Sequence, residues 1–240
     1  MDTIKLADKK KTLIVAHRGA SGIERENTIP AFVAAGNRSY YGVECDIHVT
    51  SDNKYVVYHD NETQRLCEKN VIVDETDFAT LRALKIKATG TDEFSAGYIM
   101  PTPEEYADVM KRYDKIAVVE LKNDMLEQNI REIIDIFARR YDLSKVVFIS
   151  FRFNNLVTVR KILPTQNVQF LTSKLDDSII ERLVEHKMDL DVHYKELTEK
   201  YVKKLHAKGI KINCWTCDDP KAAQKLIDWG VEYITSNILE

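Results

Sequence analysis

Three acidic residues and two histidines stand at spacings that could support hydrolytic chemistry. Glu44 and Asp46 are two positions apart in one strand-like run, and Glu120 lies near the end of another. Side chains alternate between the two faces of a strand, so Glu44 and Asp46 point the same way, about 7 Å apart. His17 ends an earlier apolar run, and His59 ends a short run that follows a turn. These five groups form one site if the fold brings the ends of the runs together.

The carboxylates favour a divalent cation. Three carboxylates gathered in one place raise each other's pKa values unless a cation lies between them. Carboxylate oxygens are hard donors that suit Mg²⁺ or Ca²⁺. The nearby histidines leave zinc as an alternative, although a ligand set dominated by oxygen favours the harder ions. We therefore predict one divalent cation, Mg²⁺ or Ca²⁺, held by Glu44, Asp46 and Glu120.

The histidines are better suited to proton transfer, because imidazole titrates close to neutral pH. Arg18, beside His17, and Lys122, two residues after Glu120, add positive charge for an anionic substrate. The guanidinium fork matches a phosphate, although Arg18 could instead pair with Glu26 in a structural role. A divalent cation, two histidines and two cationic side chains together indicate cleavage of a phosphodiester.

Alternating strand-like and helix-like segments predict the scaffold that positions these groups. Eight strands are predicted at 13–17, 42–49, 116–121, 145–150, 168–172, 189–193, 210–215 and 231–235. Seven helices are predicted between them, the first capped by Asn27 and the others at about 103–113, 125–140, 153–162, 176–187, 198–208 and 219–229. Repeated βα units require parallel strands, and eight of them match a closed (β/α)8 barrel of the α/β class, the TIM barrel. An open doubly wound sheet is the alternative, but no G-x-G-x-x-G follows the first strand.

The segment after the second strand departs from this alternation. Asp52-Asn53 predicts a two-residue turn that pairs 43–50 with 54–60 as an antiparallel hairpin and sets Asp46 opposite His59. A small helix is predicted within 74–84, and the stretch 87–100 is predicted to form a loop over the barrel mouth. We therefore expect one barrel domain over residues 1–240, with an insertion (hairpin plus loop) at about 47–100.

Composition narrows the classes of function. The chain is 44% hydrophobic, and its net charge is only −3. It therefore lacks the excess of positive charge that would favour binding to nucleic acid or to an anionic membrane. No apolar run approaches the roughly 18 residues that span a bilayer, and the first residues lack the apolar region of a signal peptide. We expect a soluble cytoplasmic protein with no nucleic-acid partner and no stable membrane insertion. The sequence leaves a homodimer open.

The cysteines are expected to be free thiols, as is usual in the cytoplasm. Cys214 and Cys217 match the C-x2-C pattern of zinc sites. A structural zinc site usually needs two such pairs, and no second pair is present. We interpret both as ordinary residues at a strand end.

A series of short motifs runs along residues 13–236, in the order His17-Arg18-Gly19, Glu26-Asn27-Thr28, Ala31-Phe32, Glu44-x-Asp46, Thr50-x-Asp52, His59-Asp60, Pro101-Thr102-Pro103-Glu104-Glu105, Glu120-Leu121-Lys122, Ser150-Phe151 and Trp215-Thr216. This order resembles the glycerophosphodiester phosphodiesterase family. Two departures from the family pattern, Cys217-Asp218 and Ser236-Asn237, fall at the predicted barrel mouth.

The resemblance implies a TIM barrel with a small insertion after the second strand. It implies metal ligation by the three carboxylates and acid–base roles for His17 and His59. It also implies phosphate contacts from Arg18 and Lys122, and packing of the substrate against Trp215, which could alternatively be a core residue.

We therefore expect a metal-dependent hydrolase that converts a small glycerophosphodiester to glycerol 3-phosphate and an alcohol. Two alternatives stay open. A related enzyme acting on lysophospholipids or another phosphodiester should have an apolar rim in the insertion, of which Tyr98, Ile99 and Met100 are a hint. A non-catalytic phosphoester-binding barrel is the other, although all five proposed metal and acid–base residues are present.

Overall fold

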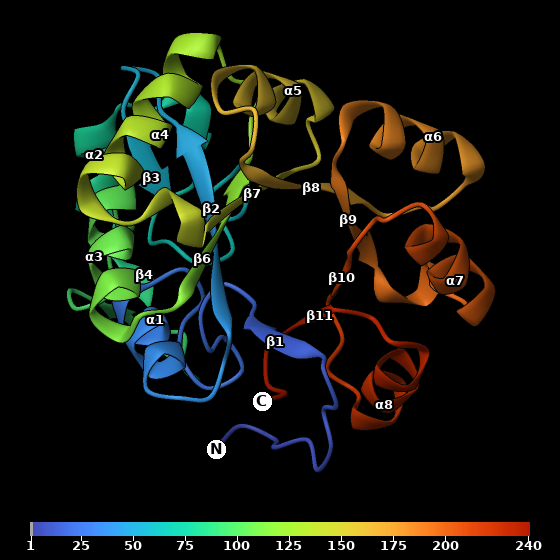
Figure 1. Ribbon diagram of the computed structural model, residues 1–240. Coiled ribbons are helices and arrows are strands. Elements are labelled where there is room, and N and C mark those ends of the chain that lie inside the picture. The colour runs from blue at the N-terminus through green and yellow to red at the C-terminus, as the bar shows by residue number, and fades with distance from the viewer. Residues whose placement is uncertain (1) are drawn as a thin grey trace.

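Eight parallel strands close into a ring in the computed structural model, which describes residues 2–240 (Figure 1). They are β1 (Leu13–Ala16), β2 (Gly42–Val49), β6 (Ile116–Leu121), β7 (Val146–Ser150), β8 (Asn167–Thr172), β9 (Asp189–His193), β10 (Ile212–Trp215) and β11 (Tyr233–Ser236). The ring closes because β1 pairs with both β11 and β2. The predicted (β/α)8 barrel is confirmed, and the strand ends agree within about two residues.

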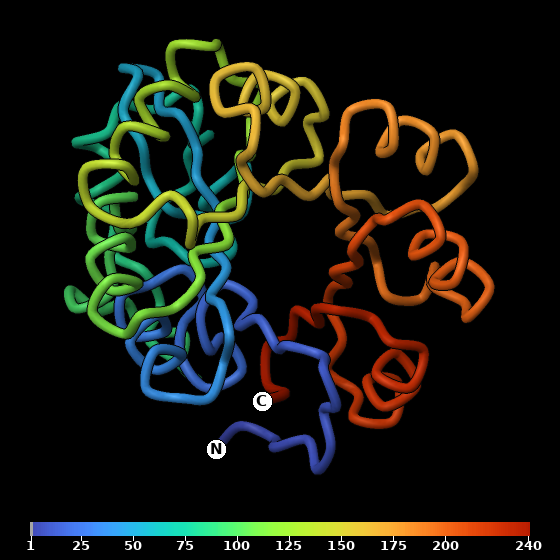
Figure 2. The backbone as a smooth tube through the Cα atoms, viewed as in Figure 1, coloured from blue at the N-terminus to red at the C-terminus, as the bar shows by residue number. Residues whose placement is uncertain are grey.

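Seven helices connect successive barrel strands and surround the ring (Figure 2). They are α1 (Ile29–Gly36), α3 (Pro103–Tyr113), α4 (Glu127–Arg140), α5 (Phe153–Ile162), α6 (Asp177–His186), α7 (Glu199–Ala207) and α8 (Pro220–Trp229). Three short 3-10 turns, η1 (Val73–Glu75), η2 (Leu143–Lys145) and η3 (Tyr194–Glu196), lie in the connections. Within residues 2–240, no helix combines the length and apolar character needed to cross a membrane.

The start of α1 differs from the prediction. Thr28 caps this helix by accepting a hydrogen bond from Ala31 N. Asn27, the predicted cap, has a φ of 52° and donates its side-chain amide to the Asp46 carboxylate at 2.7 Å. A buried carboxylate needs such a donor more than an exposed helix end does, so the asparagine turns toward the barrel.

Strand alternation sorts the side chains of β2 between two environments. Val43, Cys45 and Ile47 are fully buried in the layer between barrel and helices. Glu44 and Asp46, at the intervening positions, therefore face the barrel interior. The interior is apolar on one side, where the buried side chains are Val15, Val118, Ile149 and Leu171. On the other side, the Asn213 amide donates hydrogen bonds to Gln169 and Asp191, and Asn213 accepts one from Thr235.

The hairpin after β2 forms, but the predicted register is wrong by one residue. Val57 of β3 (Tyr55–Val57) pairs with Ile47, so Asp46 lies opposite Tyr58 rather than His59. The turn is longer than expected, because Thr50 N bonds Lys54 O and Asn53 takes a left-handed φ of 56°. Such three-residue turns need one residue in this conformation, which asparagine tolerates.

The remainder of the insertion packs beside the barrel. Helix α2 (Phe78–Ala83) confirms the predicted small helix. The predicted loop contains β4 (Ile86–Lys87) and β5 (Phe94–Ser95), which pair with each other, and none of residues 87–100 lines the cavity at the barrel mouth. The Arg25 side chain, in the loop after β1, donates hydrogen bonds to the carbonyl oxygens of Lys87 and Ala88. This anchors the segment to the side of the site, over a separate buried cluster that includes Val56, Tyr58, Leu81 and Met100.

Candidate active site

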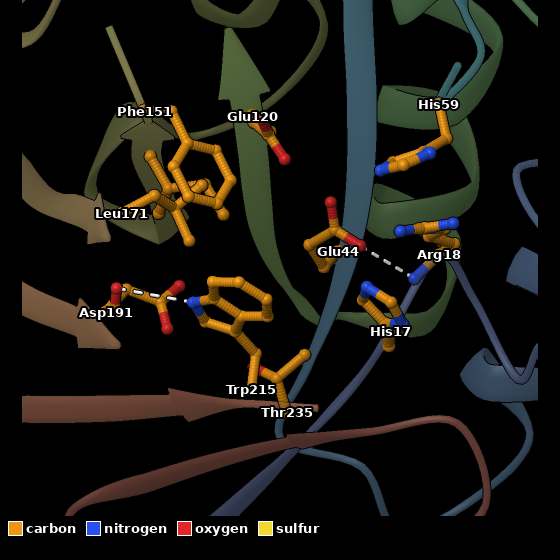
Figure 3. Close-up of a pocket in the computed structure, with 11 residues that line it drawn as sticks. His17, Arg18, Glu44, His59, Glu120, Phe151, Leu171, Asp191, Trp215 and Thr235 are labelled. Atoms are coloured by element: carbon orange, nitrogen blue, oxygen red, sulfur yellow. Dashed lines mark hydrogen bonds between the residues drawn. The ribbon is translucent and has the colours of Figure 1, made fainter. Parts of the chain in front are cut away.

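A cavity lies at the C-terminal ends of the barrel strands, with about 370 Å³ of free space, part of which is open solvent (Figure 3). It is lined by His17, Arg18, Glu44, His59, Glu120, Ile149, Phe151, Leu171, Asp191, Trp215 and Thr235. Figure 3 shows two unlike walls, with His17, Arg18 and His59 on one side and Phe151, Leu171 and Trp215 on the other. The rings of Phe151 and Trp215 meet edge to face, with centroids 5.5 Å apart. A charged wall facing an aromatic wall suits a small ligand with one anionic and one less polar part.

The three predicted metal ligands meet at the charged side. Asp46 and Glu120 are neighbours across the β2–β6 pairing, and Glu44 lies two residues before Asp46. One oxygen from each carboxylate lies within 4.8 Å of the others, and all three side chains are buried. Burial and the charge of Asp46 raise the pKa of Glu44 well above its usual value and that of Glu120 to about 8. The site therefore has an excess of negative charge.

Lys122 and Arg18 compensate part of this charge. Lys122 Nζ lies 3.2 Å from an Asp46 oxygen and 3.0 Å from a Glu120 oxygen, directly behind the cavity wall. Arg18 pairs with Glu26 at 2.8 Å, as the structural alternative expected, and it also lines the cavity. Burial opposes ionisation of Asp46, but the charges of Lys122 and Arg18 outweigh it and lower the pKa of this carboxyl.

The donor set fits a hard divalent cation. Two cationic side chains, Arg18 and Lys122, face three clustered carboxylates, so they do not compensate the full charge of the ionised cluster. Oxygen donors that are close together, buried and incompletely compensated are the environment that Mg²⁺ and Ca²⁺ occupy in proteins. Glu44, Asp46 and Glu120 are thus able to hold the ion that the sequence predicts.

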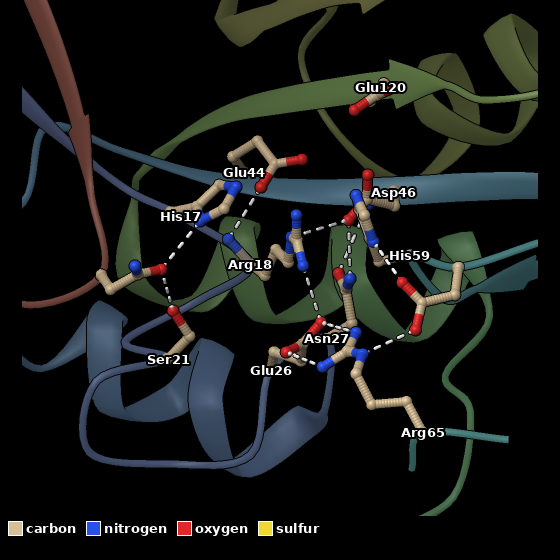
Figure 4. Close-up of polar contacts among 12 residues, drawn as sticks. His17, Arg18, Ser21, Glu26, Asn27, Glu44, Asp46, His59, Arg65 and Glu120 are labelled. Carbon is tan, nitrogen blue, oxygen red and sulfur yellow. Dashed lines mark hydrogen bonds and ion pairs between the residues drawn. The ribbon is translucent and has the colours of Figure 1, made fainter. Parts of the chain in front are cut away.

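His17 is oriented from the opposite end of the chain. Its Nδ1 lies 2.8 Å from Asn237 Oδ1, which also accepts a hydrogen bond from Ser21 Oγ (Figure 4). The Asn237 amide nitrogen donates to Asp218, which fixes the orientation of the amide group. Because an amide oxygen only accepts, Nδ1 carries the proton and Nε2 is left with its lone pair. Burial, and then the charge of Arg18, lower the pKa of His17 to about 4.

His59 has a different supporting residue. Its Nδ1 lies 2.7 Å from Asp60 Oδ1, so a carboxylate rather than an amide backs this ring. Burial lowers the pKa of His59, while the charge of Asp46 and the hydrogen bond to Asp60 act in the opposite direction. A carboxylate stabilises an imidazolium, and a neutral amide does so far less. The surroundings of the two rings therefore differ: those of His59 favour the protonated ring more than those of His17 do.

The structure brings all eight predicted site residues to one end of the barrel. His17, Arg18, Glu44, His59, Glu120 and Trp215 line the cavity, and Asp46 and Lys122 lie just behind it. Sequence reasoning missed the supporting roles of Asn237, which bonds His17, and of Arg65, which bonds Asp60 and Glu26. The only signal for Asn237 was its departure from the family pattern, and nothing in the local sequence marked Arg65.

Gly19 lets the chain turn sharply after His17 and Arg18, the two predicted site residues that follow β1. Arg18 and Gly19 have φ angles of 54° and 81°. This turn aims the Arg18 backbone amide at Glu44, with an N–O distance of 2.7 Å. A Cβ on residue 19 would lie 2.7 Å from backbone and side-chain atoms of Ala31.

Gly19→Ala is expected to destabilise the protein by at least about 2 kcal/mol, because it adds a backbone clash to the strain of a positive φ. Gly209→Ala is a matched control, since Gly209 has a φ of 73° and nothing within 4 Å of the added carbon. It should cost only about 1 kcal/mol. Urea unfolding of both variants measures the difference, and equal losses would contradict the steric argument.

A closed parallel barrel with carboxylates and histidines at the C-terminal ends of its strands defines a TIM-barrel enzyme. Residues 17–239 match the model of the glycerophosphoryl diester phosphodiesterase family. The chain belongs to this family of phosphodiester hydrolases.

Individual relatives agree with this assignment. The chain is 25% identical to a glycerophosphodiester phosphodiesterase of Bacillus subtilis over 97% of this chain and 85% of the relative. A solved glycerophosphodiester phosphodiesterase from Parabacteroides distasonis is 29% identical, with a TM-score of 0.80 over 96% of this chain and 94% of that one. A phosphodiesterase from Oleispira antarctica, solved with the product sn-glycerol-3-phosphate, has the same fold at 24% identity, with a TM-score of 0.86 over 94% and 93% of the two chains.

Proposed function

We propose that the chain is a metal-dependent phosphodiesterase that hydrolyses glycerophosphodiesters to sn-glycerol 3-phosphate and an alcohol. The observation that carries this proposal is the convergence of three carboxylates with His17 and His59 at one cavity. The product bound to the Oleispira antarctica relative supports the choice of substrate.

Glu44, Asp46 and Glu120 would hold the cation, Mg²⁺ or Ca²⁺. When bound there, such an ion supplies positive charge that neutralises the phosphate and lowers the pKa of a substrate hydroxyl. Arg18 and Lys122 add the charge that stabilises the pentacoordinate phosphorus in the transition state. Arg18 supports this role, because it lines the cavity and its Nε lies 3.5 Å from an Asp46 oxygen, beside the proposed metal ligands.

The histidines divide the proton transfers between them. His17 Nε2 accepts a proton from the 2-hydroxyl of the glycerol half, whose oxygen attacks phosphorus. His59 donates a proton to the alcohol oxygen as its bond to phosphorus breaks. Water then opens the resulting cyclic phosphate, with the proton transfers reversed. The amide behind His17 and the carboxylate behind His59 support this division.

The aromatic wall would receive the less polar part of the substrate against Trp215 and Phe151. A lysophospholipid is the alternative substrate, and the sequence predicted its apolar rim within 60–100. The cavity lining includes no residue of that segment among those described, so the geometry favours small water-soluble diesters.

A panel of glycerophosphodiesters and lysophospholipids, assayed with Mg²⁺, Ca²⁺, Mn²⁺ or chelator, tests the proposal. We expect release of glycerol 3-phosphate from the water-soluble diesters, dependence on one of the hard cations, and loss of activity in chelator. Full activity in chelator would contradict the metal requirement, and preference for lysophospholipids would contradict the substrate class.

We also propose a cytoplasmic location, which the four buried and unpaired cysteines support. Cell fractionation tests it, and recovery of the protein outside the cytoplasm would contradict it.

A further inference from the structure

Arg65, in the loop that follows β3, bridges two carboxylates beside the cavity (Figure 4). Its Nε donates to Asp60 Oδ2 at 2.7 Å. Its two terminal nitrogens donate to the two oxygens of Glu26 at 2.7 and 2.8 Å. This fork-to-fork pairing is the strongest geometry for an arginine and a carboxylate, and it fixes the guanidinium plane.

Each of these carboxylates also holds a residue of the candidate site. The other oxygen of Asp60 lies 2.7 Å from His59 Nδ1. Glu26 accepts a hydrogen bond from Arg18 Nη1 at 2.8 Å. One guanidinium thus connects the loop after β1, which presents Arg18, with the loop after β3, which presents His59.

Without this connection, the support of His59 would be weak. The side chains of His59 and Asp60 are 31% and 27% exposed, and a single pair at that exposure gains little over its contacts with water. A network of charge-assisted hydrogen bonds restricts each member more than isolated pairs do. Burial opposes ionisation of Glu26, but the hydrogen bonds of Arg65 and the charge of Arg18 outweigh it and lower its pKa to about 2. Glu26 therefore stays ionised and keeps Arg18 in place.

We infer that Arg65 is a positioning residue that aims His59 Nε2 and the Arg18 guanidinium at the same phosphate. The inference rests on the proposed function, since it presumes the acid–base role of His59. Arg65 is not among the residues that line the cavity, and three of its hydrogen bonds go to Asp60 and Glu26. It therefore acts through these carboxylates and not by contact with the substrate.

Arg65→Ala should lower kcat about 10- to 100-fold and change KM by no more than about 2-fold. Arg65→Lys should recover little, because one ammonium cannot bond both carboxylates in fork geometry. Added methylguanidinium should restore part of the kcat of Arg65→Ala. Arg140→Ala is the matched control, since Arg140 is similarly exposed and forms a 3.4 Å ion pair with Asp108 on the helical surface. It should behave as wild type.

Two kinetic results would overturn the inference. One is a wild-type kcat in Arg65→Ala. The other is a raised KM with an unchanged kcat, which would mean that Arg65 contacts the substrate directly.

Nitrogen-15 NMR of the His59 ring separates failure of the inference from failure of the proposed function, because it requires no turnover. At a pH at which the ring is neutral, wild type should show His59 protonated at Nδ1, and Arg65→Ala should show a mixture of tautomers, whichever phosphodiester the protein cleaves. An unchanged tautomer in Arg65→Ala would overturn the positioning role even if the chain is a glycerophosphodiester phosphodiesterase.

Discussion

His17→Ala is expected to lower turnover of a glycerophosphodiester by at least about 100-fold while metal binding survives. The reason is that Asn237 holds the proton on His17 Nδ1, so that Nε2 is free to accept one from the substrate. His206→Ala is the control, because His206 is exposed and its ring bonds Glu232 at the far end of α7. Steady-state kinetics give turnover, and calorimetric titration with Mg²⁺ or Ca²⁺ verifies that the carboxylates still bind the ion.

His59→Ala is expected to slow release of an alkyl alcohol in a single turnover by a similar factor, but to slow release of p-nitrophenol in a single turnover much less. A good leaving group needs no proton from a general acid, whereas the attacking hydroxyl still needs a base. His17→Ala should therefore be impaired with both substrates. The reverse pattern would exchange the acid and base roles, and near-wild-type activity in either variant would remove that histidine from the mechanism.

Glu44→Gln is expected to lower activity by about 1,000-fold and yet to stabilise the metal-free protein. Burial and Asp46 raise the pKa of Glu44 in the folded state, so the folded protein holds that proton more tightly than the unfolded chain does. Ionised Glu44 therefore destabilises the fold at pH values above the ordinary glutamate pKa of about 4.3. Glutamine removes that charge, and its oxygen can still accept the hydrogen bond from Arg18 N.

Thermal unfolding in chelator at neutral pH should show a Tm a few degrees higher for Glu44→Gln than for wild type. The difference should vanish below about pH 4, where Glu44 is protonated in both states. Added Mg²⁺ or Ca²⁺ should raise the Tm of wild type and have little effect on the variant. Glu181→Gln, on the exposed face of α6, controls for loss of a charge. A lower Tm for Glu44→Gln than for wild type in chelator would show that the carboxylates of Glu44, Asp46 and Glu120 do not destabilise the metal-free fold by mutual repulsion.

The sequence predicted the barrel well because its elements depend on local patterns. Apolar runs of five to eight residues predicted the strands, and α3 begins with a local signal, the capping box of Thr102 and Glu105 around Pro103. The candidate site followed from the same information. Polar residues at the ends of parallel strands meet at one face of a barrel, so their positions in the sequence suffice to group Glu44, Asp46 and Glu120.

The features that were wrong or missed depend on contacts between distant segments. The hairpin register depends on the length of the turn, and the three-residue turn requires a left-handed backbone at Asn53. A two-residue turn was equally compatible with the sequence. Asn27 looked like a helix cap, but its amide bonds the buried Asp46 instead. The sequence around Arg65 gives no sign of a special role. Its role becomes visible only in the fold, where Arg65 bonds both Glu26 and Asp60.

The distance in sequence between His17 and the residue that orients it has a consequence for biosynthesis. Asn237 is 220 residues further along the chain, beyond the last barrel strand. During synthesis, His17 leaves the ribosome long before Asn237 does. Until Asn237 is in place, His17 Nδ1 lacks the acceptor that it has in the folded protein. Hydrolytic competence would therefore be acquired only after Asn237 has been synthesised and β11 has docked beside β1, and appearance of activity during refolding would report on completion of the ring.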